Sequence, residues 1–135
     1  MRRTSFLTGA LFALLAMATV AAFGSAQEKK EKFKYAELES FHELLAPIWH
    51  QQYPAKEWGK IRAQSGELVR RKDAIMNLRL RTKADQQARI EELKKSFGAS
   101  VDALAKTAKS GPDEELQKSV ATMHEAFETF ADAVR

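Results

Sequence analysis

The chain has 135 residues, of which 30% are charged and 44% are hydrophobic, and its formal net charge is +4. It contains no cysteine, which excludes disulfides, thiolate metal sites and a lipoprotein anchor. The length predicts one domain, and the modest charge gives no indication of nucleic-acid binding.

Residues 1–26 have the three-part layout of a secretory signal peptide. A basic head, Arg2-Arg3, precedes an apolar run at 7–23, and small residues occupy 24–26. This order predicts export by the general secretory route, with a twin-arginine signal and an uncleaved membrane anchor left as alternatives. We therefore expect a periplasmic or secreted protein with no membrane span after cleavage.

The mature chain is expected to begin near Gln27. Removing the first 26 residues leaves 20 Lys and Arg against 18 Asp and Glu. Residues 27–33 are predicted to be a mobile lead-in, and residues 34–135 the folded domain.

The first predicted helix covers residues 34–53. Its apolar residues Leu38, Phe41, Leu45, Ile48 and Trp49 recur at helical spacing and form one stripe. Pro47 removes a backbone donor, so we expect a bend just before it. Tyr53-Pro54 should end the helix, because the residue before proline avoids helical dihedrals.

Three further helices are predicted at 55–80, 83–109 and 112–134. Their apolar stripes are Trp58, Ile61, Leu68, Val69, Met76 and Leu80, then Ile90, Leu93, Phe97, Val101, Leu104 and Ala108, and finally Leu116, Val120, Met123, Phe127, Phe130 and Val134. No segment has the alternation of a strand, and the connections are short. The sequence therefore predicts an all-α fold, an antiparallel up-down-up-down four-helix bundle.

Two features of the second helix bear on its interpretation. Gly66 should loosen its middle. The basic cluster Arg70, Arg71 and Lys72 is interpreted as a solvated face in preference to a site for an anionic partner.

The candidate functional residues are the histidines. His42 lies eleven residues before Tyr53, and His124 lies twelve after Pro112, which is a rise of ~16 and ~18 Å along adjacent helices. Both lie at the border of an apolar stripe. We therefore expect them to approach each other across the seam between the first and last helices.

Carboxylates lie within one turn of both histidines. Glu39 and Glu43 flank His42, and Glu128 follows His124 by four residues. Imidazole with carboxylate and no thiolate suits a divalent transition metal such as copper, zinc or nickel. The alternative is that these histidines are interface residues with satisfied hydrogen bonds.

His50 fits this site less well. It lies eight residues from His42, a rise of ~12 Å, whereas two histidines chelating one ion from one helix normally lie four apart. A sharp bend at Pro47 would bring it in. Otherwise it could form a second weak site with Glu57 or Glu115.

Two other residue types are assigned to packing. Trp49 and Trp58 flank the Tyr53-Pro54 turn and are predicted to cap the core. Met123 could bind Cu(I), but its place on the buried stripe favours core packing.

The export signal, the helix count and the ligand pair resemble the periplasmic cytochrome b562 and cytochrome c′ group over the whole mature chain. Covalent haem would need a Cys-x-x-Cys-His motif, which is absent. The cytochrome b562 pattern would match its haem histidine to His124, but His42 stands where that pattern needs methionine. The resemblance therefore implies a haem-free, metal-binding relative, with non-covalent haem b and electron transfer as an alternative.

A second resemblance is to periplasmic stress chaperones of the CpxP/Spy type. Leu80, Thr82 and Gln86 approximate one copy of their paired Leu-Thr-x-x-Gln motif, without a second copy. Chaperone activity is thus the alternative from another class, and a homodimer remains open. No nucleophile with a partnered histidine and no phosphate-binding loop is present, so we do not expect an enzyme.

Overall fold

The computed structural model describes residues 33–135, and every regular element in that range is helical, which confirms the all-α class. The predicted signal peptide and all but the last residue of the predicted lead-in lie outside the described residues. Phe33, the last residue of that lead-in, packs on Phe127 with ring centroids 5.9 Å apart. No helix in this range is both long enough and apolar enough to cross a bilayer.

The helices follow one another in a simple order. They are α1 (Ala36–Pro47), the π-helix η1 (Ile48–Gln52), α2 (Trp58–Ala63), α3 (Ser65–Met76), α4 (Gln87–Ser110) and α5 (Asp113–Ala133).

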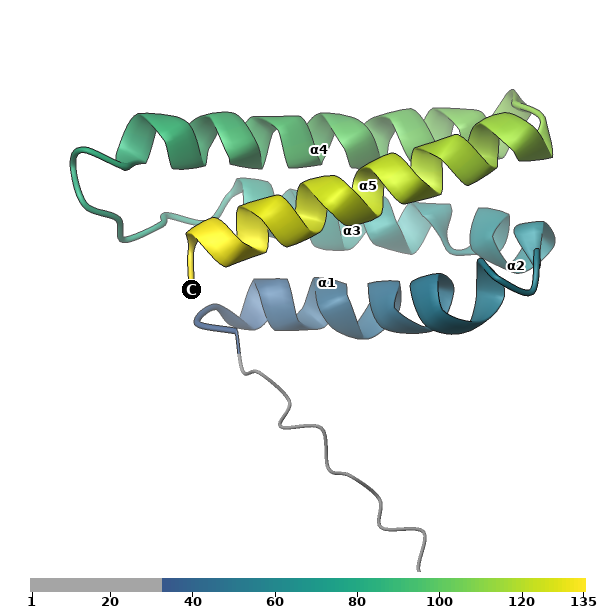
Figure 1. Cartoon of the computed structure of the whole chain (residues 1–135), viewed down its shortest axis with the longest axis horizontal. Coiled ribbons are helices and arrows are strands. Elements are labelled where there is room, and N and C mark those ends of the chain that lie inside the picture. The colour runs from purple at the N-terminus through teal and green to yellow at the C-terminus, as the bar shows by residue number, and fades with distance from the viewer. Residues whose placement is uncertain (1–32) are drawn as a thin grey trace, which may run out of the picture. The chain divides into compact units, whose positions relative to one another are not determined.

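Neighbouring helices form a closed ring of contacts. α4 packs against α5 and α3, and α3 packs against α1 (Figure 1). Aromatic side chains complete the ring, because Phe41 of α1 stacks on Phe127 of α5 at 5.1 Å between centroids. Each helix can therefore bury its apolar stripe against two neighbours.

The core contains most residues of the predicted stripes, but of the six in the second predicted helix only Ile61 and Leu68 are buried. Four phenylalanines fill its centre and are fully buried, and Phe97 meets Phe41 edge to face at 4.9 Å. The six predicted residues of α5 are all buried, as are four of the six on α4. Ile75 of α3, which the predicted stripe omits, is also fully buried.

The second predicted helix, 55–80, is wrong in its extent. It is two helices, α2 and α3, separated at Gln64 with φ −94° and ψ −3°. The Gln64 amide donates to Gln52 Oε1 at 2.6 Å and to the Lys60 carbonyl at 2.9 Å, which holds the break in place. Gly66, which was expected to loosen the middle, lies inside α3.

The same helix also ends earlier than predicted, at Met76. Tertiary contacts hold the following segment in a non-helical path. Lys94 Nζ donates to the Leu78 carbonyl at 2.9 Å, and the Arg81 N–H donates to the Tyr35 hydroxyl at 2.9 Å. Residues 77–86 therefore form a connection that lies outside both helices.

The predicted disturbance at Pro47 takes the form of a π-helix. α1 runs up to Pro47, and η1 begins at the next residue. Its wider spacing is visible where the Tyr53 N–H donates to the Ile48 carbonyl at 2.8 Å, five residues earlier. A proline that removes one ladder bond favours such an irregular turn.

Arg62 joins three helices at the α4–α5 turn. Its guanidinium donates to the carbonyls of Thr107 and Ala108 at 3.2 and 3.0 Å, and to Gly111 at 2.9 Å. It also pairs with Asp113 at 2.9 Å. One side chain from α2 thereby bonds to two carbonyls in the last turn of α4, of which Thr107 also accepts from the Gly111 N–H, and to the first acidic residue of α5.

Candidate functional site

His124 of α5 lies at the seam between α1 and α5. Its ring stacks on Trp49 of η1, with centroids 3.9 Å apart and planes 9° from parallel. The side chain is 23% exposed. Trp49 covers one face of the imidazole, whereas the ring nitrogens bond in the plane of the ring, at its edge.

His42 lies along the same seam. Its ring is 5.1 Å from Phe33 and 6.2 Å from Phe127. Phe127 is three residues after His124 on α5, so the closest ring partner of His42 on α5 lies about one turn beyond His124. That His42 and His124 lie at one level stays a prediction.

The other two histidines nevertheless act electrostatically on His124. Burial lowers the pKa of His124, the nearby Glu128 carboxylate opposes this effect, and the charges of His50 and His42 lower the pKa further. His50, which is exposed on η1, therefore lies within electrostatic reach of His124 together with His42. His50 lies on the π-helix. On a regular helix, its spacing of eight residues from His42 would make it a poor partner for that histidine.

The lowered pKa has a chemical consequence. At neutral pH the His124 imidazole is uncharged, and this is the form that binds a metal ion. Burial is the largest cause of the lowered pKa, and the charges of the other two histidines add to it.

The three candidate carboxylates differ in their surroundings. Glu128 lies one turn after His124, with 4.0 Å between its Oε1 and Nε2 of the imidazole. Glu39 accepts a bond from the Phe33 N–H at 3.4 Å and so contacts the start of the domain. Glu43 is exposed. Glu128 is thus the candidate carboxylate that lies against a histidine.

The side chains as they lie do not form a preformed metal site. Within residues 33–135, no group of three or more His, Cys, Asp or Glu is placed to hold one ion. Glu57, one proposed partner of His50, forms an ion pair with Lys60. Any metal at the seam would need a small rotation of the exposed His50 or of Glu128.

An aromatic column continues from His124. Trp49 stacks on Tyr53 at 4.8 Å, and Tyr53 meets Trp58 edge to face at 5.9 Å. Both tryptophans are half-buried and pack on the core, as predicted for core caps. The stack between Trp49 and His124 was not predicted, although Trp49 adjoins His50 in the sequence.

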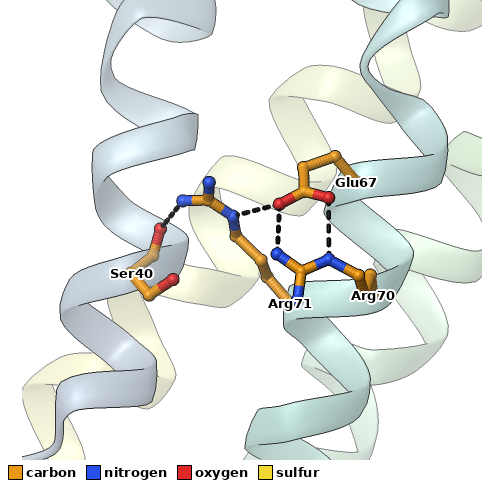
Figure 2. Close-up of polar contacts among 4 residues, drawn as sticks. All are labelled: Ser40, Glu67, Arg70 and Arg71. Carbon is orange, nitrogen blue, oxygen red and sulfur yellow. Dashed lines mark hydrogen bonds and ion pairs between the residues drawn. The ribbon is translucent and has the colours of Figure 1, made fainter.

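The basic cluster of α3 is neutralised from within the protein. Arg70 and Arg71 both donate to Glu67, and Arg71 also reaches the Ser40 carbonyl of α1 (Figure 2). These hydrogen bonds lower the pKa of Glu67 to about 2. Arg71 therefore joins α3 to α1, whereas Arg70, whose side chain is 70% exposed, lies on a solvated face as the sequence predicts.

Lys72, the third member of that cluster, is buried. It pairs with Asp73 and Asp102 at 2.6 and 2.8 Å. Burial by itself would lower its pKa, but the hydrogen bonds to the two carboxylates outweigh that effect and the pKa is raised. Lys72 thus serves as a charged link between α3 and α4.

Comparisons of the chain with protein-family models, curated proteins and solved structures find no match. The likeness to the cytochrome b562 and cytochrome c′ group therefore stays a prediction from the sequence.

Proposed function

We propose that this is an exported helical-bundle protein that binds a divalent transition metal, Cu²⁺ or Zn²⁺, at the seam between α1 and α5. His124 is the principal ligand. The observation that carries the proposal is the electrostatic coupling of His124 to both other histidines and to Glu128 at a half-buried position. A second imidazole comes from His42 or His50.

The chemistry of the seam supports such an ion. Nitrogen and carboxylate oxygen are suitable donors for Zn²⁺ and Cu²⁺, and stacking on Trp49 would fix the orientation of the principal imidazole. His50 is exposed and free to rotate its side chain without disturbing the core. Glu39, Glu43 or Glu128 and water would complete the coordination.

The fold and the export route form part of the same proposal. α2 and α3 together take the place of one helix, so that the helices make an antiparallel up-down-up-down four-helix bundle. Residues 1–26 act as a signal peptide. The mass of the protein recovered from the periplasm tests the cleavage, and an amino terminus at Gln27 is expected.

The decisive experiment is calorimetric titration of Cu²⁺ and Zn²⁺ into the protein and into His42→Ala, His50→Ala and His124→Ala. We expect His124→Ala to weaken binding at least about tenfold, the usual result of losing one ligand. The ion binds only the folded state, so it should also raise the melting temperature. Glu125→Gln removes an exposed charge next to His124 and serves as the matched control for Glu128→Gln.

An optical measurement locates the ion independently. Trp58→Phe leaves Trp49 as the sole tryptophan, and Cu²⁺ at His124 should quench its fluorescence strongly because their rings are stacked. Unchanged affinity in His124→Ala would refute the site. Metal-independent suppression of client aggregation would favour the chaperone alternative, and a haem absorption band would favour haem b.

A further inference from the structure

Met76, the last residue of α3, lies directly on the backbone of α4. A Cβ atom built on Gly98 of α4 would fall 2.8 Å from the Met76 sulfur and 3.2 Å from its terminal methyl group. Any larger residue at position 98 would displace the thioether. Gly98 therefore forms a seat that holds the sulfur between the two helices.

The same side chain is accessible from solvent. Met76 is half-buried and lines an open cavity of about 530 Å³ together with Glu91, Glu92, Lys94 and Lys95. The lining is mostly charged, so water and small polar molecules can enter. The sulfur thus combines a fixed position with an open approach.

Met123 provides a contrast within the described part of the chain. It is fully buried in the stripe of α5, with 0% exposure. An oxidant in solution reaches such a sulfur only when the structure opens.

We propose that Met76 is a site of reversible oxidation by hydrogen peroxide. The sulfur attacks one peroxide oxygen, the O–O bond breaks and an S–O bond forms, which gives methionine sulfoxide and one molecule of water. The sulfur loses two electrons and the peroxide gains them. Susceptibility of methionine to this reaction follows its exposure, which separates Met76 from Met123.

Oxidation changes the contact between α3 and α4. Sulfoxide is larger and polar, whereas the thioether lies so close to Gly98 that not even a Cβ atom fits between them without displacement. The connection 77–86 begins beside this seat and is held by the bond from Lys94 to the Leu78 carbonyl. The sulfoxide should therefore loosen the end of α3 and this connection.

Peptide mapping after graded peroxide treatment of the full-length protein tests the proposal. Trypsin places Met76 in the peptide 73–79 and Met123 in 119–135, so mass spectrometry follows each sulfur separately, apart from Met1 and Met17. We expect Met76 to be oxidised at least about tenfold faster than Met123, because only the latter needs an opening event. The melting temperature should fall as the Met76 sulfoxide accumulates, and reduction by methionine sulfoxide reductase should restore it.

Two variants complete the test. Met76→Leu keeps an apolar side chain on Gly98, so its melting temperature should not change at peroxide levels that oxidise Met76 in the parent. Gly98→Ala should displace the sulfur towards solvent and speed its oxidation further. Equal rates for Met76 and Met123, or a melting temperature unaffected by complete oxidation of Met76, would overturn the proposal.

Discussion

Arg62 offers the sharpest test of how the helices are held together. Its guanidinium bonds to three backbone carbonyls near the α4–α5 turn and to Asp113, and its side chain is only 25% exposed. Arg62→Ala removes this donor from the Ala108 and Gly111 carbonyls near the negative end of α4, whereas the Thr107 carbonyl keeps its bond from the Gly111 N–H.

The size of the effect follows from those contacts. A hydrogen bond from a charged donor contributes about 1.5–3 kcal/mol, but the three are not additive and water can reach part of the site. The ion pair to the 61% exposed Asp113 adds less than about 1 kcal/mol. We therefore expect Arg62→Ala to lower the free energy of unfolding by about 2–4 kcal/mol.

Urea denaturation followed by circular dichroism gives the measurement, with Asp113→Asn and Arg62→Lys as controls. Asp113→Asn should cost less than about 1 kcal/mol, because it removes only the exposed pair. Arg62→Lys should restore less than half of the loss, since an ammonium group cannot span acceptors that a planar guanidinium joins. A loss below about 1 kcal/mol for Arg62→Ala, or one equal to that of Asp113→Asn, would refute the reasoning.

Three further predictions concern the core, the acid stability and one glycine. Phe97→Ala should destabilise the protein by about 3–5 kcal/mol in the same denaturation assay, and a loss below about 1 kcal/mol would contradict its central position. The pKa of Glu67 is about 2 in the folded protein, below the ordinary 4.5, because Arg70 and Arg71 bind its charged form. The stabilisation by the pairs of Glu67 with Arg70 and Arg71 is therefore present above pH 4.5 and is lost as the pH falls towards 2. In Glu67→Gln the free energy of unfolding should fall less steeply at acid pH. An unchanged acid dependence would count against the pairing. Gly66→Ala should raise stability by about 0.5–1 kcal/mol, since a Cβ there meets no atom within 4 Å, and a thermal melt that shows destabilisation would exclude this.

Helical periodicity was a reliable guide where a helix is long and has an uninterrupted stripe. α5 is predicted at 112–134 and observed at Asp113–Ala133, with all six stripe residues buried. The turn before it also lies where the predicted helices 83–109 and 112–134 meet. In this part of the chain local propensity and burial favour the same structure.

Periodicity failed where tertiary contacts compete with the helix. The segment 55–80 has a continuous apolar pattern, yet Gln64 interrupts it with side-chain bonds to a residue twelve positions earlier. The end at Met76 depends likewise on Lys94, whose long apolar stem can be buried while its ammonium group bonds to a backbone carbonyl. Neither contact leaves a signal in the local sequence.

For the candidate site, a metal ion at the seam stays a prediction, and the aromatic neighbours of the histidines were not predicted. Apolar stripes indicated the seam that holds His42 and His124. Counting residues from the helix ends assumed regular helices and level ends, and the π-helix together with the connection at 53–57 shifted Trp49 opposite His124. Aromatic neighbours of a histidine depend on such shifts, which a residue count does not capture.

The π-helix has an evolutionary consequence. A turn closed by bonds over five residues holds one more residue than an α-helical turn. Deleting Gln51 would close this turn to an ordinary α-helical one and keep the Tyr53 N–H within reach of the Ile48 carbonyl, so the segments on either side need not rotate. A deletion inside a regular helix instead rotates every following side chain by about 100°. Selection should therefore tolerate the loss of one residue in this segment more readily than in α4 or α5.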